Sequence, residues 1–125
     1  LIRNLWAFTV IFCGHFPDGT ETFSADTVDG ETRAAWYLRQ LRGSANFEGS
    51  PLLHVLSGHL SHQIEHHMFP DIPARRYPAM AREVRAICAR YGVAYNTGSL
   101  AGQFATVVRR VVRLAFPPSV TQAVA

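Results

Sequence analysis

Apolar side chains recur at every third or fourth position between residues 51 and 70. These positions are Leu52, Leu53, Leu56, Leu60, Ile64 and Met68. This spacing places side chains on one face of a helix. Pro51 is favourable in a first helical turn, and Pro70 marks a helix end. The pattern therefore predicts one continuous helix that begins at Pro51 and ends before Pro70.

The same periodicity predicts helices on both sides of this segment. Residues 74–91 combine an apolar face with arginines elsewhere on the surface, and Gly92 is a suitable stop. Residues 100–115 form a second amphipathic pattern, which a Pro-Pro pair follows. Residues 32–42 are compatible with a short helix. A polar, glycine-punctuated stretch before them reads as a loop, with a short strand expected at residues 21–23.

The beginning of the chain is apolar from residue 5 to residue 13. This run is far shorter than the ~20 residues that a spanning helix needs. Because the sequence opens with Leu1 inside an apolar pattern, we expect the run to be the exit end of a transmembrane helix whose beginning is missing. Cys13 and Cys88 form no paired motif, which fits a reducing, cytosolic side of the membrane.

Charge is distributed unevenly along the chain. All 12 basic residues are arginines, against nine acidic residues. Residues 1–65 hold four arginines and seven acids, a net charge of −3, and residues 66–125 hold eight arginines and two acids, a net charge of +6. A basic half close to a membrane exit suits anionic headgroups, so we expect residues 74–115 to bind anionic vesicles. No nucleic-acid motif accompanies the arginines, and we expect no nucleic-acid partner.

Histidine is concentrated in the segment with the apolar pattern. Five of the six histidines fall between His54 and His67. On a helix, Gln63, His66 and His67 stand at i, i+3 and i+4, so their side chains meet over one turn, and His59 would share that face. Imidazole is the commonest metal ligand in proteins, and the cluster favours a metal site. The alternative is a polar helix face, or histidines hydrogen-bonded inside a core.

Gln63 to Pro70 resembles the third histidine box of membrane fatty acid desaturases. The form with glutamine in the first position is similar to that of front-end and linoleoyl-CoA-type desaturases. Further similar segments, in the same order as in that family, are Arg39-Gln40, Ser44-Ala45-Asn46-Phe47, Gly58, Leu60, Tyr77-Pro78-Ala79 and Cys88 to Tyr95. The resemblance covers about residues 33–114.

This resemblance implies an all-α fold, as the C-terminal fragment of a multi-helix membrane di-iron enzyme. The implied metal ligands are Gln63, His66, His67 and His15, where His15 either completes the iron site or is only a histidine in a turn. The implied chemistry uses two iron ions and O2 to introduce a cis double bond into a fatty acyl-CoA or acyl-lipid. Electrons would come from a separate donor of the cytochrome b5, ferredoxin or reductase type. We expect the fragment alone to be inactive.

Several residues in and near the box have roles that stay open. Gln63 could bind iron directly, through water, or only by orienting a histidine. His59 and His62 are not in the implied ligand set. Glu65 points away from the ligand face, so we expect it to support a ligand or to make a surface contact. Asn46 could orient a ligand or water, although we favour a capping role.

The predicted organisation has four parts, most of them on the cytoplasmic face. Residues 1–16 are the end of a transmembrane helix, and residues 17–50 are a cytosolic loop with a short helix. Residues 51–116 hold the histidine-box helix and two amphipathic helices, and residues 117–125 are a frayed tail. Three alternatives remain: a membrane di-iron hydroxylase or oxygenase, a non-enzymatic metal-binding or membrane-surface module, and a helical fragment without metal.

Overall fold

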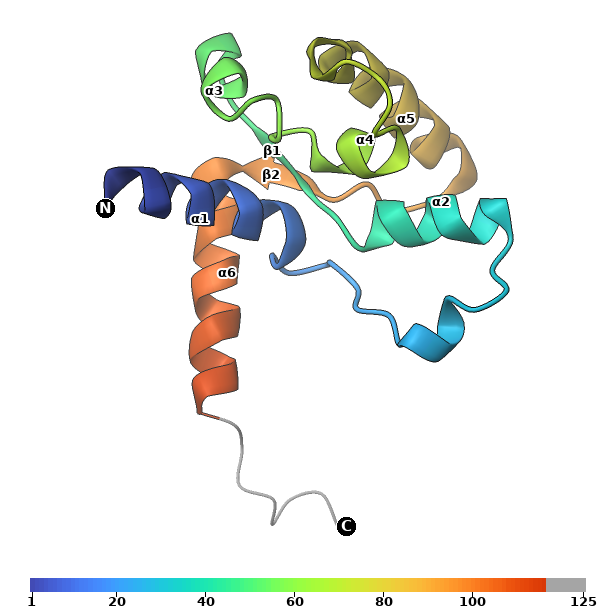
Figure 1. Ribbon diagram of the computed structural model, residues 1–125, viewed down its shortest axis with the longest axis horizontal. Coiled ribbons are helices and arrows are strands. Elements are labelled where there is room, and N and C mark those ends of the chain that lie inside the picture. The colour runs from blue at the N-terminus through green and yellow to red at the C-terminus, as the bar shows by residue number, and fades with distance from the viewer. Residues whose placement is uncertain (117–125) are drawn as a thin grey trace.

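The computed structural model describes residues 1–116, which form a mainly helical structure with one small sheet (Figure 1). In chain order the elements are α1 (Ile2–His15), η1 (Ala25–Thr27), α2 (Arg33–Arg42), β1 (Asn46–Glu48), α3 (Pro51–Leu56), α4 (Gln63–Met68), η2 (Ala74–Arg76), α5 (Tyr77–Tyr91), β2 (Thr97–Ser99) and α6 (Leu100–Ala115). The predicted tail at 117–125 lies outside the described residues.

Three predicted helices are confirmed, and their ends have clear local causes. Helix α2 begins after Thr32, whose side chain accepts a hydrogen bond from the amide of Ala35. Helix α6 begins after Ser99, which caps it in the same way. Helix α5 ends at Gly92, which adopts the left-handed conformation with φ of 64°.

The prediction of one continuous helix from residue 51 to residue 70 is wrong. Helix α3 ends at Leu56, and α4 begins only at Gln63. Between them Gly58 and His59 both have positive φ, 61° and 62°, which a right-handed helix cannot contain. His59 therefore does not share a helix face with Gln63, and its expected position beside the box is also wrong.

The all-α prediction is corrected by two short parallel strands. Strand β1 pairs with β2, with Asn46 opposite Thr97 and Glu48 opposite Ser99. The strand expected at residues 21–23 is not formed. The loop there instead leads into the short 3-10 turn η1, and the amide of Glu21 donates a hydrogen bond to the carbonyl of Arg42.

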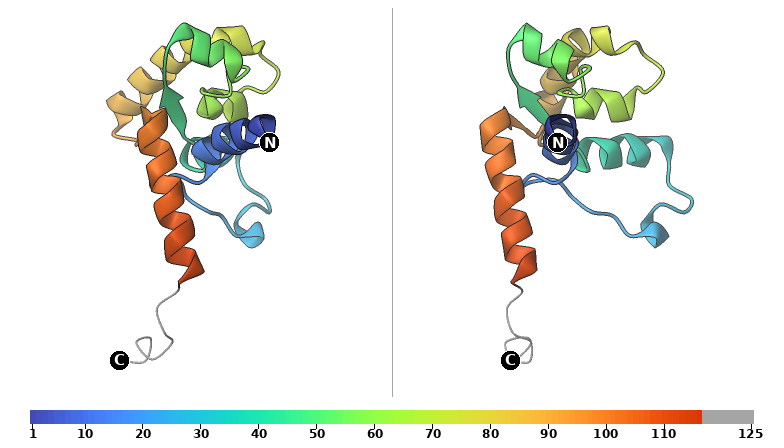
Figure 2. Two further views of the ribbon diagram at one scale, coloured as in Figure 1. Left: turned by 90° about the vertical axis from the view of Figure 1, so that its left-hand side faces the viewer. Right: turned by 60° about the vertical axis from the view of Figure 1, so that its left-hand side comes forward.

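Two apolar clusters hold α1 and α4 in place. In one, Ile64 of α4 packs with Leu41 of α2 and with Val84 and Cys88 of α5. The other cluster joins Val10 and Cys13 of α1 to Phe47 of β1, with side chains of α3 and α6 around them. Figure 2 shows α4 close to α1 although they are far apart in the sequence. The two clusters thus bring the histidine box against the end of α1.

No helix among residues 1–116 has the length and apolar composition needed to cross a bilayer. Helix α1 has 14 residues, many of them apolar and exposed. The assignment of residues 1–16 to the end of a spanning helix stays a prediction, as does the division of the chain into four parts.

Candidate metal centre

The side chain of Gln63 meets histidines from two helices. Gln63 is the first residue of α4 and is buried, and its Nε2 atom lies 3.1 Å from His15 Nε2 and 3.3 Å from His67 Nε2. The two imidazole rings are perpendicular, with centroids 4.9 Å apart. We call Gln63, His15 and His67 the glutamine cluster. The cluster connects the end of α1 to the histidine box, because His15 and Gln63 are 48 positions apart in the sequence.

Gly14 makes this close approach possible. A Cβ atom at this position would lie only 2.9 Å from Gln63 Cγ and 3.2 Å from Gln63 Cδ. The absence of a side chain at Gly14 therefore lets the carboxamide lie against the backbone of α1. The neighbouring residue, His15, reaches the same carboxamide from the last turn of the helix.

The glutamine cluster has the chemistry of a metal site. The amide nitrogen of Gln63 can donate to both imidazoles, but its Oε1 is buried and has no hydrogen-bond partner among the described residues. Rotating the carboxamide by 180° would exchange its Nε2 and Oε1 atoms. Oε1 would then face the Nε2 atoms of both His15 and His67. Donor atoms that share one metal ion at about 2.1 Å lie about 3 Å apart, which matches these separations. The residues present thus fit a metal ion.

His66 lies beside the cluster without contacting the carboxamide. Its ring centroid is 5.7 Å from that of His67, and its Nδ1 lies 3.4 Å from the hydroxyl of Tyr77. Tyr77 is buried at the start of α5, so this contact fixes one side of the imidazole and leaves Nε2 for another partner.

In residues 1–116, no three His, Cys, Asp or Glu side chains are grouped so that they could hold a metal ion.

The protonation of His67 suits a ligand. Burial and, to a smaller extent, the neighbouring His15 and His66 together lower the pKa of His67 to about 4. The imidazole is consequently neutral near pH 7. A neutral ring offers the lone pair that metal coordination requires.

Glu65 lies on the other side of α4 inside a buried network. Its Oε2 accepts a hydrogen bond of 2.8 Å from Asn46 Nδ2, and its Oε1 accepts one of 2.9 Å from the hydroxyl of Tyr95. Burial raises the pKa of Glu65, although both hydrogen bonds oppose the shift. The carboxyl group is fully buried, so the expected surface contact is not made. Its partners Asn46 and Tyr95 are not in the glutamine cluster, and a supporting role for Glu65 stays a prediction.

Asn46 connects this network to the start of α4. Its Oδ1 accepts a hydrogen bond of 2.9 Å from the backbone amide of Ile64, one of the amides in the first turn that lack a helical partner. Asn46 thus satisfies a helix amide as a cap does, although it lies in β1 and the N-cap residue of α4 is His62. The cap belongs to a helix 18 residues further along the chain, and it fixes the direction in which the box presents its side chains.

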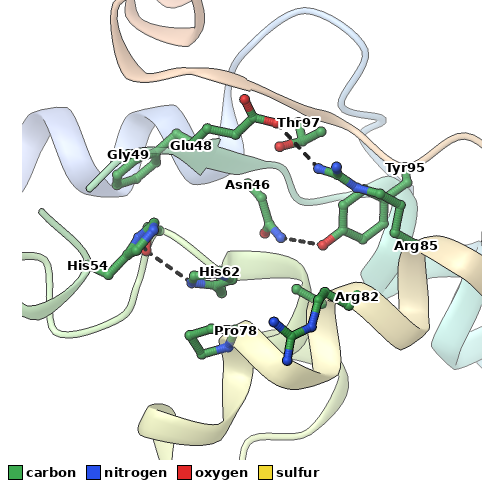
Figure 3. Close-up of a pocket in the computed structure, with 13 residues that line it drawn as sticks. Asn46, Glu48, Gly49, His54, His62, Pro78, Arg82, Arg85, Tyr95 and Thr97 are labelled. Atoms are coloured by element: carbon green, nitrogen blue, oxygen red, sulfur yellow. Dashed lines mark hydrogen bonds and ion pairs between the residues drawn. The ribbon is translucent and has the colours of Figure 1, made fainter. Parts of the chain in front are cut away.

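A second group of histidines adjoins the same end of α4. The hydroxyl of Ser61 lies 2.7 Å from His54 Nδ1 and 3.1 Å from His62 Nδ1, and we call these three residues the serine cluster. It borders a cavity of about 270 Å³, into which Arg82 and Arg85 also project from α5 (Figure 3). One hydroxyl can donate to one ring and accept from the other, so both Nδ1 atoms are satisfied.

Sequence reasoning missed several residues that shape the site. Gly14, Ser61, Tyr77 and Tyr95 all contact box residues or their partners, and none was singled out for such a role. A glycine directly before His15 is the only local signal among them, because it allows a close approach. The others lie in segments whose contacts with the box arise only in the folded chain.

Comparisons with known proteins show which family the chain is similar to. A family model described as "Fatty acid desaturase" matches residues 1–99. The chain is 48% identical over 115 residues to the NADPH-dependent stearoyl-CoA 9-desaturase of Mycobacterium tuberculosis, covering 92% of this chain and 27% of that protein. It is 35% identical over 109 residues to human Fatty acid desaturase 3, covering 87% of this chain and 23% of that protein.

A further relative comes from Synechocystis. The sn-1 linoleoyl-lipid 6-desaturase of Synechocystis is 32% identical over 89 residues, covering 70% of this chain and 25% of that protein. No solved structure matches the chain. The chain thus spans about a quarter of the length of these curated relatives. Because the family model covers most of the sequence, the chain belongs to the fatty acid desaturase family.

Proposed function

We propose that this chain is the part of an oxygen-dependent fatty acyl desaturase that supplies Gln63, His66, His67 and His15 to a histidine-ligated di-iron centre. The observation that carries the proposal is the glutamine cluster. It joins two imidazole Nε2 atoms and a buried carboxamide within 3.3 Å, and leaves one carboxamide oxygen without a partner. In a group of histidines that has only a structural role, the buried polar atoms have hydrogen-bond partners, as both Nδ1 atoms of the serine cluster do.

The relatives support a fatty acyl substrate. Among their names are a stearoyl-CoA desaturase and a linoleoyl-lipid desaturase, so a CoA-linked and a lipid-linked acyl chain both occur in the family. When bound, two iron ions would supply the oxidising power that removes two hydrogen atoms from an acyl chain. With O2, two electrons and two protons, the overall products would be a cis alkene and two molecules of water.

The residues of this chain would hold and orient the donors in that reaction. His15 and His67 present neutral imidazoles, and Gly14 gives the carboxamide of Gln63 room between them. Tyr77 fixes the ring of His66. The network of Glu65 with Asn46 anchors α4 from its opposite side, so the donor atoms keep their positions.

The electrons would come from a separate partner at the membrane. The relative from Mycobacterium tuberculosis is named NADPH-dependent, which fits a donor of the reductase type, with cytochrome b5 or ferredoxin as carriers. The proposed location is an integral membrane protein with this segment mostly on the cytoplasmic face. The clustering of exposed apolar side chains on a few helices supports that location.

The test combines iron analysis with product analysis in a full-length enzyme that carries this chain. We expect bound iron and an alkene product by gas chromatography and mass spectrometry when O2, a reductase system and acyl substrates are present. An alcohol product would identify a hydroxylase instead. The 125-residue chain alone should form no product, since the relatives are roughly three to four times as long.

Variants at Gln63 test its part in the site. Gln63→His converts the box to the all-histidine form and should retain iron. Gln63→Ala should retain less iron and less activity than Gln63→His, because it removes the carboxamide that contacts both His15 and His67. If Gln63→Ala kept full iron and activity, the glutamine cluster would have no role in metal binding.

A further inference from the structure

The cavity beside the serine cluster is separate from the glutamine cluster. Its volume is about 270 Å³, and its walls come from β1, the serine cluster, α5 and residues 95–97. None of Gln63, His15, His66 and His67 lines it. Small-molecule sites typically measure roughly 300–1,000 Å³, so this cavity has room for one part of a ligand rather than for a whole cofactor.

Arg82 is a charged side chain of this cavity that has no protein partner. It projects from α5 towards the cavity and is exposed (Figure 3). Among residues 1–116 it makes no ion pair and no hydrogen bond. A guanidinium group stays charged near neutral pH and presents several N–H donors in a fixed plane. Arg82 can therefore bind an anion that enters the cavity.

Arg85 adds a second positive charge, three positions further along α5. Its Cζ atom lies 5.3 Å from the centroid of the Tyr95 ring, a cation–π contact that positions the guanidinium. One of its nitrogens lies 3.4 Å from Glu48 Oε1, but the two side chains are 54% and 61% exposed, and such an ion pair is weak. Among the described residues that line the cavity, Glu48 is the only acid, so positive charge is in excess there.

The other polar groups of the lining also favour an anion. Asn46 and Tyr95 donate hydrogen bonds to the two oxygens of the buried Glu65, so this carboxylate does not reach the cavity as a free acceptor. In the serine cluster, a ring that accepts a hydrogen bond from the hydroxyl at its Nδ1 carries its proton on Nε2. One of the two histidines that line the cavity thus offers a further N–H donor.

We propose that this cavity, which we call the arginine cavity, binds a phosphate group of a coenzyme A carrier through Arg82 and Arg85. The planar fork of arginine matches the oxygens of a phosphate group, and such charge-assisted hydrogen bonds are roughly twice as strong as neutral ones. Coenzyme A carries its phosphates at the far end of a long arm from the acyl chain, so they bind away from the reacting carbons. The choice of this carrier rests on the proposed function, and a relative is named for a stearoyl-CoA substrate.

The test is the binding of coenzyme A without an acyl chain to the full-length protein that carries this chain. Isothermal titration calorimetry at constant ionic strength gives the dissociation constant, and neither iron nor turnover is needed. We expect Arg82→Ala to raise the dissociation constant by roughly 10–100-fold, because it removes hydrogen bonds to a charged group. Arg82→Lys keeps the charge without the fork, so its dissociation constant should lie between those of Arg82→Ala and the unchanged protein.

Arg90→Ala is the matched control. Arg90 is also an exposed arginine of α5, but it does not line the arginine cavity. The substitution makes the same change in charge and in helix propensity, and it should leave coenzyme A binding unchanged. Equal weakening by Arg82→Ala and Arg90→Ala would show a general attraction to the basic helix and overturn the proposal. Circular dichroism shows whether each variant keeps its helices.

Two further probes identify the bound group and its source. Pantetheine lacks phosphate, so it should not distinguish Arg82→Ala from the unchanged protein. Glycerol 3-phosphate represents the headgroup of a phospholipid, and we expect it to bind more weakly than coenzyme A. If Arg82→Ala weakened the binding of glycerol 3-phosphate but not that of coenzyme A, the site would belong to a lipid headgroup and the assignment to coenzyme A would be wrong.

These results can be told apart from the outcome of the desaturase assay. If coenzyme A binds through Arg82 while the full-length protein forms no alkene, the proposed reaction fails and the arginine cavity stands as a phosphate site. If the alkene forms but Arg82→Ala and the unchanged protein bind coenzyme A equally, the reaction stands and the proposed phosphate site is wrong.

Discussion

Two groups of histidines adjoin the start of α4, and they differ in what their ring nitrogens face. In the serine cluster, both Nδ1 atoms face one hydroxyl, which can satisfy both. In the glutamine cluster, both Nε2 atoms face one carboxamide, and its oxygen remains unpartnered. The first arrangement is complete as it stands. The second has a buried polar atom that a metal ion would satisfy.

Burial and protonation do not separate the two clusters. Burial lowers the pKa of His62 to about 4, as it does for His67, and nearby histidines contribute in both places. Neutral imidazole is therefore available in either cluster. The two clusters therefore differ in the partners of their ring nitrogens, whereas residue type and lowered pKa are common to both, and the proposed metal site depends on that difference in partners.

The largest expected effect comes from His67→Ala in the full-length enzyme. The substitution removes a donor from the glutamine cluster, and no neighbouring side chain can replace it without moving α4. We expect turnover to be abolished and iron per polypeptide to fall. The effect should exceed the roughly 10–100-fold losses typical of residues that only support a metal ligand.

His62→Ala is the matched control for this prediction. It removes a histidine with a similarly lowered pKa from the serine cluster. Iron content and double-bond formation should change little. If His62→Ala lost iron while His67→Ala kept it, the assignment of the two clusters would have to be reversed.

A second large effect is expected from Gly14→Ala. The new Cβ would lie 2.9 Å from Gln63 Cγ, so the carboxamide must move away from His15 and His67. Misplacing a group at a reacting centre by about 1 Å can lower a rate by about 10²-fold. We expect activity to fall on that scale, and iron content to fall with it. Fold stability is followed separately by thermal unfolding.

Gly98→Ala is the control for the added methyl group. A Cβ at Gly98 would have its nearest contact at 3.6 Å, with Gln103 Cδ, which is an ordinary van der Waals distance. This variant should keep its iron and its activity. Normal iron binding in Gly14→Ala would mean that Gln63 does not need its present position.

Much of the helical structure could be predicted because its signals are local. Periodic apolar positions defined α5 and α6, and Gly92 marked an end that the structure confirms. The break between α3 and α4 was missed because Leu60 continues the apolar period through it. Gly58 was the sequence signal for this break, since glycine readily adopts the positive φ found there.

Contacts between distant segments were less predictable. Strands β1 and β2 have three residues each and pair across about 50 residues of sequence, so neither carries a strand pattern of its own. His15 was included in the ligand set only through the family resemblance. Its contact with Gln63 depends on the apolar packing of α1 and α4, which periodicity alone does not reveal.

A smaller effect is expected from Glu65→Ala, which tests the support of the glutamine cluster. The substitution leaves one N–H of Asn46 and the hydroxyl of Tyr95 without an acceptor, whereas Asn46 Nδ2 keeps its hydrogen bond of 2.6 Å to the Tyr95 oxygen. Each unsatisfied group costs about 1–3 kcal/mol, so the free energy of unfolding should fall by roughly 2–4 kcal/mol. Loss of a residue that supports a ligand should also weaken iron binding by about tenfold.

Glu65→Gln is the control for Glu65→Ala, because it keeps the shape of the side chain. It keeps an acceptor for Asn46 and nearly the same volume, so most of the stability and iron binding should return. Chemical denaturation gives the stability, and titration with iron gives the affinity. Equal iron affinity in Glu65→Ala and the unchanged enzyme would show that the network does not act on the glutamine cluster.

The smallest effect is expected from Ser61→Ala, which removes the centre of the serine cluster. Ser61 is fully buried, and its hydroxyl is hydrogen-bonded to both His54 and His62. Both rings are only partly buried, so water can reach them after the change. The free energy of unfolding should fall by about 1 kcal/mol, and iron per polypeptide should stay constant. A loss of iron comparable to that of His67→Ala would show that both clusters belong to one metal centre.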